Sequence, residues 1–272
     1  MLHYKTYPHR TSREWVVFLH GLGGSSSIWF KQIKAFREHY NLLLVDLRGH
    51  GKSKGRLPDL DSYDFKHLSR EVLEVLDHQN ISKAHFVGIS LGSVVINTIN
   101  LLSPQHVQSM VLGGAITRFN LRSRLLIHLG DAFKKVLPYM WLYKLFAGIL
   151  MPRKNHAHSR RLFTKEATEM GQKEFIRWFQ ITKKVEPLHQ EVSLSAASRP
   201  KLYLMGSEDY MFLPLVKEDT DESKNETLST IEGSGHVCNM DKPKEFNKKA
   251  LAFFQLHAER EEVSDGASLS GR

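Results

Sequence analysis

Apolar and polar positions follow two different patterns along this chain. In residues 1–116 and again in residues 199–257, short apolar runs of strand length alternate with segments whose apolar residues recur at helical spacing. In one such segment, FKHLSREVLEVLDHQN, residues Leu68, Val72 and Leu76 share one helical face. Strands that alternate with helices predict an α/β fold, a doubly wound and mostly parallel sheet with right-handed crossovers. The expected strands are HYKTYP, EWVVFLHG, YNLLLVDLRG, KAHFVG, VQSMVLGG, RPKLYLMGSED and ETLSTIEGSGH.

Residues 117–198 interrupt this alternation. They contain no strand-like run, and apolar and basic stretches such as LRSRLLIHLGDAFKKVLPYMWLYKLFAGILM take its place. We therefore expect a helical insertion after the strand near residue 112, which divides one core domain into residues 1–116 and 199–257. Residues 117–198 are called the insertion below. The last residues, 258–272, are polar and small, and we expect a disordered tail there.

The positive charge of the chain is concentrated in the insertion. The whole chain carries a formal charge of +9, whereas residues 117–199 alone hold 16 Lys and Arg against 6 Asp and Glu, a net charge of +10. Such a region can attract nucleic acid, anionic lipid or acidic substrates, or it can simply keep a surface hydrated. Basic pairs such as Lys134-Lys135 and Arg160-Arg161 flank apolar stretches, which suits a lipid-like substrate with an anionic head or contact with an anionic membrane surface. We expect no nucleic-acid partner, and the oligomeric state is left open.

Cysteine content and the first residues bear on the compartment. Cys238 is the single cysteine, so no intrachain disulfide can form, which fits a reducing environment. The stretch MLHYKTYPHRTSREW has no apolar segment of the kind found in signal peptides. These features favour a cytoplasmic location. The apolar stretch LPYMWLYKLFAGILM is too short, and too interrupted by Lys144, to span a membrane.

A serine stands between two glycines where an expected strand meets an expected helix. The segment Gly88-Ile89-Ser90-Leu91-Gly92 follows the apolar run HFV and precedes SVVINTINLL. One interpretation is a plain turn that needs glycines to bend. The other is a nucleophile on a sharp strand-to-helix turn, where glycines two residues before and after the serine permit close packing. The motif alone does not decide between them.

A nucleophilic serine needs a base and an acid that orients the base. His236 stands in a glycine-rich loop directly after an expected strand, and Asp209, with Glu208 as the neighbouring candidate, follows the strand before it. The resulting order Ser90, Asp209, His236 is the Ser…Asp/Glu…His order of a hydrolytic triad on an α/β sheet. Because each residue follows a different parallel strand, all three can converge at one edge of the sheet.

Such a triad also needs two backbone N–H donors for the oxyanion of the tetrahedral intermediate. Leu91, the residue after the serine, is one candidate. Leu22, in the small-residue loop HGLGG after an early strand, is the other. No cofactor is required by this chemistry. We expect no metal site either, because the pair His156 and His158 has no cysteine or carboxylate companion in the sequence pattern.

Taken together, these segments resemble the α/β-hydrolase fold superfamily, in particular its group of serine esterases, proline iminopeptidases and haloperoxidases. The resemblance rests on FLHGLGGSSSIW, LLLVDLRGHGKS, HFVGISLGS, LYLMGSED and GSGHVCNMDKP in family order, and it covers residues 13–257 apart from the insertion. It implies that Ser90 is a nucleophile, and it implies a helical cap at the position of the insertion. Lyases of this fold from menaquinone synthesis carry an arginine four residues after the serine, where this chain has Val94.

The resulting hypothesis is a serine hydrolase of carboxylesterase type. It would cleave carboxylic esters with an apolar acyl group, and possible variants are thioesters and lactones, through an acyl-enzyme intermediate. Part of the apolar stretch in the insertion is expected to line the acyl pocket. Two alternatives stay open: a lyase or acyltransferase that uses the same triad, and a signalling protein of this fold that binds a ligand.

Overall fold

A seven-stranded sheet forms the centre of the part of the chain that the computed structural model describes, residues 1–134, 136–195 and 199–269. Its strand order is β1-β3-β2-β4-β5-β6-β7, and only β1 is antiparallel to its neighbour. The structure thus confirms the α/β fold with a mostly parallel sheet, and each expected strand run contains one strand. The bounds are β1 His3–Tyr7, β2 Trp15–Leu19, β3 Asn41–Asp46, β4 Ala84–Ile89, β5 Val107–Gly113, β6 Lys201–Gly206 and β7 Glu226–Ile231.

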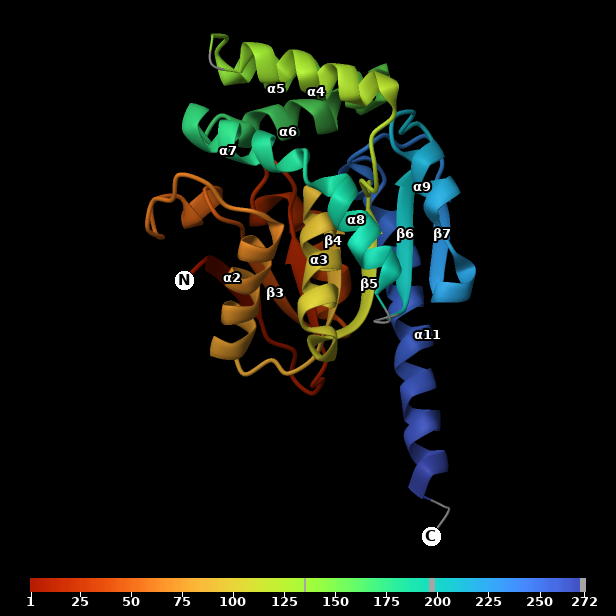
Figure 1. Ribbon diagram of the computed structural model, residues 1–272. Helices are drawn as coiled ribbons and strands as arrows, with labels where there is room; N and C mark the ends of the chain where they lie inside the picture. The colour runs from red at the N-terminus through yellow and green to blue at the C-terminus, as the bar shows by residue number, and fades with distance from the viewer. Residues whose placement is uncertain (135, 196–198, 270–272) are drawn as a thin grey trace.

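Helices cover both faces of the sheet, so alternate strand residues enter two different cores (Figure 1). α2 (Phe65–His78) and α3 (Leu91–Leu102) pack on the face to which Val17 of β2 points. α1 (Phe30–Arg37) and α11 (Pro243–Leu269) pack on the other face, to which Val16 and Phe18 point. Because both faces are buried, the strands read as continuous apolar runs. The remaining core helices are α9 Leu213–Asp219, α10 Cys238–Asp241 and the 3₁₀ helices Ser26–Trp29, Gly51–Ser53, Pro104–His106 and Glu222–Lys224.

The insertion lies between β5 and β6 and caps one end of the sheet (Figure 1). Its described residues form α-helices and no strand. Asn120 is the N-cap of the first of these helices. Its side chain accepts a hydrogen bond from the backbone N–H of Ser123 at 2.9 Å. The helices are α4 Leu121–Phe133, α5 Tyr139–Leu150, α6 Ala157–Ala167, α7 Gln172–Thr182 and α8 Val185–Leu194, with a 3₁₀ helix at Lys154–His156.

The C-terminal helix differs from our expectation of a disordered tail over residues 258–272. α11 continues to Leu269, and its distal part extends beyond the body of the protein (Figure 1). The stretch AEREE at residues 258–262 consists of good helix formers, which allows the helix to continue past the packed part. Residues 270–272 lie outside the described residues.

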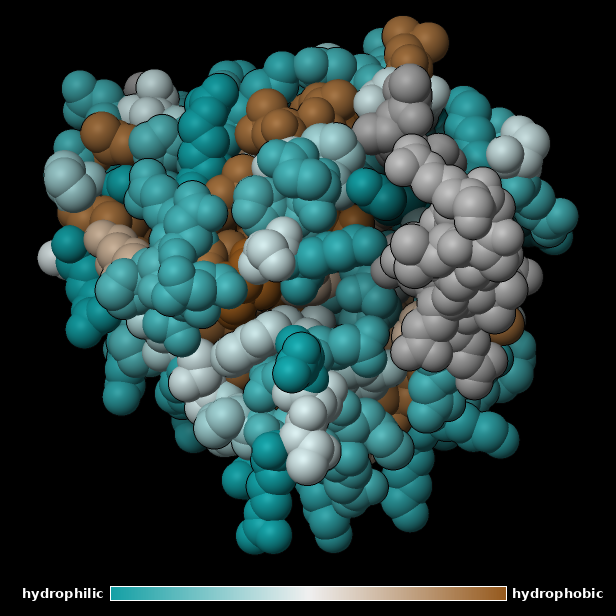
Figure 2. Space-filling model, turned by 90° about the horizontal axis from the view of Figure 1, so that it is seen from below, coloured by the Kyte–Doolittle hydropathy of each residue, from teal (hydrophilic) through white to brown (hydrophobic). Residues whose placement is uncertain are grey.

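The surface at the end opposite α4 and α5 is mostly hydrophilic, with hydrophobic residues showing only between polar ones (Figure 2). Among the helices that the structure describes, none combines the length and the apolar composition that crossing a membrane requires.

Two buried histidines hold the loop that follows β2. His20 Nε2 accepts a hydrogen bond from the backbone N–H of Leu47 at 2.9 Å, and His50 Nε2 accepts one from Gly23 N–H at 2.9 Å. Each Nδ1 lies within 2.9 Å of a backbone carbonyl oxygen, which can only accept. Both rings are therefore neutral, with the proton on Nδ1. Burial lowers the pKa of His20, and it lowers the pKa of His50 to about 3.

This pair makes the fold sensitive to acid. An unfolded histidine has a pKa of about 6.5, so the unfolded chain binds protons that the folded chain excludes. The stabilisation is complete above about pH 6.5 and is lost as the pH falls toward the folded pKa. We expect the melting temperature to drop between pH 7.5 and pH 5, and to drop less in His50→Gln, which is also less stable at pH 7.5. Circular dichroism melts over this range test the prediction. The exposed His128→Gln serves as control, and equal pH profiles of His50→Gln and the native chain would contradict it.

Candidate active site

Ser90 sits on a strained turn between β4 and α3. Its backbone has φ 54° and ψ −125°, a conformation that costs a non-glycine residue about 1–3 kcal/mol. The space around the turn admits glycine only. A Cβ on Gly88 would lie 2.9 Å from the Gly92 carbonyl carbon, and a Cβ on Gly92 would lie 2.4 Å from the Leu19 carbonyl oxygen. The sequence pattern around Ser90 is therefore a requirement of this sharp turn, which lifts the hydroxyl to the edge of the sheet.

Side chains from two neighbouring strand ends extend from Ser90: His236, after β7, reaches the serine, and Asp209, after β6, reaches His236. His236 Nε2 lies 3.0 Å from Ser90 Oγ, and His236 Nδ1 lies 2.8 Å from Asp209 Oδ2. His236 and Asp209 are fully buried, and Ser90 is nearly so. With a proton on Nδ1 donated to the carboxylate, the lone pair of Nε2 faces the serine hydroxyl. The three residues expected from the sequence thus form one hydrogen-bonded chain that can remove a proton from Ser90.

Glu208, the other candidate acid, faces away from His236 and toward the insertion. Its carboxylate accepts hydrogen bonds from Arg153 Nη1 at 2.5 Å and from Asn155 Nδ2 at 2.9 Å, and it lies 2.8 Å from His156 Nε2. The hydrogen bond from Asn155, followed by the charge of Arg153, lowers the pKa of this carboxyl. Glu208 therefore links the core to the insertion, and Asp209 is the acid next to His236.

The two expected oxyanion donors, Leu22 and Leu91, flank Ser90. Leu91 is the first residue of α3, whose N–H has no partner within the helix. The loop that carries Leu22 touches the turn: a Cβ on Gly21 would lie 2.9 Å from Ser90 Cβ and 3.5 Å from Leu91 N. Within the described residues, neither the Leu22 N–H nor the Leu91 N–H donates a hydrogen bond. Leu22, Ser90 and Leu91 line the same pocket, so both N–H groups remain candidates for an oxyanion hole.

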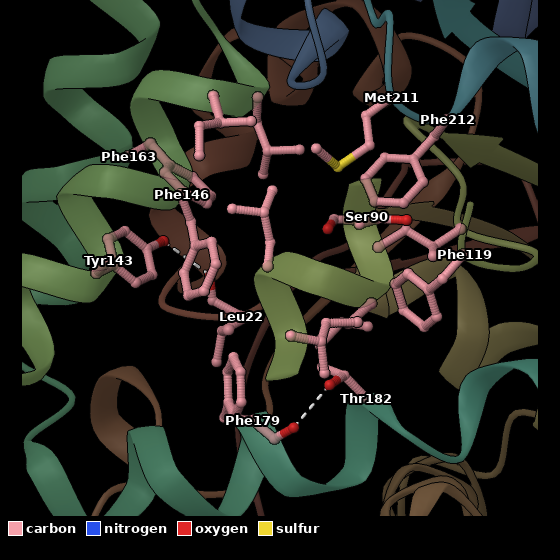
Figure 3. A pocket seen from close by; sticks show the side chains of 17 residues that line it. Leu22, Ser90, Phe119, Tyr143, Phe146, Phe163, Phe179, Thr182, Met211 and Phe212 are labelled. Atoms are coloured by element: carbon pink, nitrogen blue, oxygen red, sulfur yellow. Dashed lines mark hydrogen bonds between the residues drawn. The ribbon is translucent and has the colours of Figure 1, made fainter. Parts of the chain in front are cut away.

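An apolar pocket of about 120 Å³ opens in front of Ser90 (Figure 3). Its walls come mostly from the insertion, whose aromatic side chains project into it. Hydroxyl groups in the wall are bonded elsewhere: Tyr143 donates to the Leu22 carbonyl at 2.9 Å, and Thr182 donates to the Phe179 carbonyl at 2.6 Å. The pocket therefore presents a hydrocarbon surface next to the serine. Residues that shape it include Phe119, Ile127, Phe146, Phe163, Phe179 and Phe212.

Several of these features were not predicted from the sequence. The wall residues of the insertion and the partners of Glu208 depend on how separate helices pack, which no local pattern reports. His20 directly follows β2 and His50 lies in the loop after β3, but the sequence pattern alone indicates no role for either histidine. In residues 1–134, 136–195 and 199–269 no three His, Cys, Asp or Glu side chains are grouped as metal ligands. His156 contacts Glu208.

Comparison with known proteins is consistent with this fold. A profile of the alpha/beta hydrolase fold family matches residues 14–143. A putative carbamate hydrolase RutD of Pseudomonas savastanoi pv. phaseolicola is 28% identical over 257 residues, covering 88% of this chain and 92% of that protein.

Two solved structures share the architecture. One comes from work on carboxylesterases of Nitrososphaera gargenis, with a TM-score of 0.78, 19% identity and 95% of both chains covered. The enol-lactonase from Burkholderia xenovorans has a TM-score of 0.75 at 19% identity, covering 93% of this chain and 96% of the other. At such identities these structures support the fold alone. The seven-stranded architecture, the profile match and the structural neighbours together show that this chain has the α/β-hydrolase fold.

Proposed function

We propose that this chain is a serine hydrolase that cleaves carboxylic esters with an apolar acyl group. The observation that carries the proposal is the position of the Ser90 hydroxyl. It ends a hydrogen-bonded chain through His236 to Asp209, and it faces a pocket with hydrocarbon walls. A hydroxyl in contact with a base is activated as a nucleophile, and an apolar pocket beside it accommodates the hydrocarbon part of an acyl group.

The first half of the reaction forms an acyl-enzyme. Ser90 Oγ attacks the ester carbonyl carbon while His236 Nε2 takes the hydroxyl proton. Asp209 keeps the imidazole in the required orientation and stabilises the imidazolium. The negative charge on the carbonyl oxygen is stabilised by the N–H groups of Leu22 and Leu91. His236 then gives its proton to the leaving alcohol as the carbon–oxygen bond breaks.

The second half releases the acyl group. His236 removes a proton from a water molecule, whose oxygen attacks the acyl carbon, and the same two N–H groups stabilise the second oxyanion. Collapse of this intermediate breaks the bond to Ser90 Oγ, which recovers its proton from His236. The products are a carboxylic acid and an alcohol. No metal ion or organic cofactor takes part in this scheme.

Ester hydrolysis is preferred to two other uses of the site. The RutD relative is named a carbamate hydrolase, but a carbamoyl group is small and polar, and it would leave the aromatic walls without a partner. A lyase or a ligand-binding protein would not consume water as a substrate. p-Nitrophenyl esters and a p-nitrophenyl carbamate, assayed over many turnovers, distinguish these functions. Sustained release of carboxylic acid supports the proposal, whereas a single turnover or activity on the carbamate alone opposes it.

The first prediction concerns the nucleophile. Ser90→Ala is expected to abolish covalent labelling by a fluorophosphonate and to lower esterase kcat by roughly 10⁴-fold, because the members of such a triad act as a unit. Gel fluorescence and steady-state kinetics measure the two effects. Ser93→Ala, one turn along α3, is the matched control for labelling. If the Ser90 variant still reacts with the probe, the nucleophile has been assigned wrongly.

A second prediction separates the two adjacent acids. Asp209→Asn keeps the shape but loses the carboxylate that orients His236, so we expect kcat to fall by about 10³–10⁴-fold. Glu208→Gln can still accept hydrogen bonds from the insertion, and its kcat should change less than about tenfold. Matching circular dichroism spectra would show that both variants fold. The opposite ranking of the two kcat values would move the role of orienting acid to Glu208.

The third prediction concerns the acyl pocket. Phe146→Ala removes an aromatic wall from α5 and is expected to shift the optimum of kcat/KM toward longer p-nitrophenyl esters. Trp141→Ala, on the exposed side of the same helix, should leave the chain-length profile unchanged. The ratio of kcat/KM for octanoate to that for butyrate measures the shift, with an increase of about tenfold expected for the two or so extra methylenes accommodated. An unchanged ratio in Phe146→Ala would show that the acyl group binds elsewhere.

A further inference from the structure

The outer side of α4 is an apolar stripe that the described residues leave exposed. Leu121, Leu125, Leu129 and Phe133 follow one another at four-residue intervals, and each side chain is between 48% and 84% exposed. The opposite side of α4 faces the pocket through Ile127 and its neighbours. The inner side of the helix already packs against the rest of the protein. Packing within the described fold therefore does not explain why the outer residues are leucines.

The apolar surface continues beyond α4. Of the twelve large hydrophobic residues that are exposed in the described chain, seven lie in residues 121–145. These include Val136 after α4, and Trp141 and Leu145 one turn apart on α5. Both helices lie at the outer end of the protein in Figure 1, opposite the mostly hydrophilic end in Figure 2. Exposed apolar side chains concentrated in this way mark an interaction surface.

A basic groove borders this apolar surface. It lies between α5 and α6, has a volume of about 520 Å³, and is lined by Lys144, Arg160, Arg161 and Lys165. Arg160 is held by the carbonyl of Met151, whereas Lys144, Arg161 and Lys165 form no ion pair within the described residues. Gly148 lines the groove and adds no side chain to it. A Cβ at this position would meet no atom within 4 Å. The groove thus combines open space with positive charge that the fold does not neutralise.

The charge decides which partner suits the surface. A second copy of this chain would bring two insertions together, each with a net charge of +10 over residues 117–199, and they would repel. A bilayer with anionic lipids offers hydrocarbon to the leucines and the tryptophan, and phosphate to the cations beside them. Lys135, which is included in this net charge, lies outside the described residues.

We propose that the outer side of α4 and α5, together with the groove between α5 and α6, docks on an anionic lipid bilayer. These elements are called the docking face. Leu121, Leu125, Leu129 and Trp141 enter the interface between headgroups and acyl chains, and a lipid phosphate occupies the groove beside Lys144. The contact is peripheral, and it does not depend on the reaction proposed for Ser90.

Co-sedimentation with vesicles tests the proposal on the full chain. Vesicles of phosphatidylcholine alone are compared with vesicles that also contain phosphatidylglycerol, each at low and at physiological salt. We expect at least about tenfold tighter binding to the anionic vesicles at low salt, and weaker binding as salt screens the charges. Because binding is measured directly, the outcome is independent of esterase activity.

Two variants separate the apolar and the basic contributions. Leu125→Ser with Leu129→Ser removes the centre of the stripe, and Lys144→Glu with Arg161→Glu and Lys165→Glu reverses the charge of the groove. Each is expected to weaken binding to anionic vesicles by at least about tenfold, since a single basic residue contributes roughly fivefold near such a surface. The control is Phe30→Ser with Lys34→Glu and Arg37→Glu, an exposed apolar and basic group on α1, which should bind like the native chain. Thermal melts verify that all variants fold.

Three results would overturn the proposal. One is equal, negligible binding to both kinds of vesicle. Another is a loss of binding in the α1 control that matches the loss in the docking-face variants. The third is a dimer in light scattering that the Leu125 and Leu129 substitutions dissociate, because the surface would then belong to contact between copies of this chain.

Discussion

The backbone of Ser90 is the constraint on which the rest of the site depends. A serine at φ 54° is held there only because chain segments on both sides press against the turn without intervening side chains. Gly21 approaches from the loop after β2, and the Ser90 N–H donates to the carbonyl of Gly113 at the end of β5. β4 must therefore lie inside the sheet, between β2 and β5. The strain of about 1–3 kcal/mol in the turn is offset by this packing, so the position of the hydroxyl is a property of the whole sheet.

Core and insertion contribute different things to the site. The polar groups that can act on a substrate come from loops at the ends of β2, β4, β6 and β7, which the sheet holds in fixed relation. The insertion contributes mainly hydrocarbon, with the inner sides of α4 and α5 facing the pocket and their outer sides facing solvent. A change in the insertion can thus alter which acyl group or surface is accepted without moving the reactive groups.

The sheet and the residues of the proposed triad were predictable from the sequence for physical reasons. Strands buried on both faces leave long apolar runs, and residues that directly follow parallel strands meet at one edge, which brings Ser90 and His236 together. The sequence favoured Asp209 and kept its neighbour Glu208 as a candidate, because which of the two faces His236 depends on how the loop after β6 turns. The wall of the pocket was not predictable either, since contacts such as that between Gly130 and Phe179 join helices distant in sequence.

Glu208 and Asp209 are adjacent in sequence, but their carboxylates bind residues of different parts of the protein. Glu208 holds Arg153 and Asn155 of the insertion, while Asp209 holds His236. His156 of the insertion also packs on the residue before His236, where a Cβ on Gly235 would lie 2.9 Å from its ring. The insertion thus contacts the residues directly before Asp209 and directly before His236. Functional side chains need to be held to within about 0.5 Å, and contacts from neighbouring residues contribute to that precision. Some of the contacts that hold the insertion on the core are therefore made by Glu208 and Gly235, the immediate neighbours in sequence of Asp209 and His236.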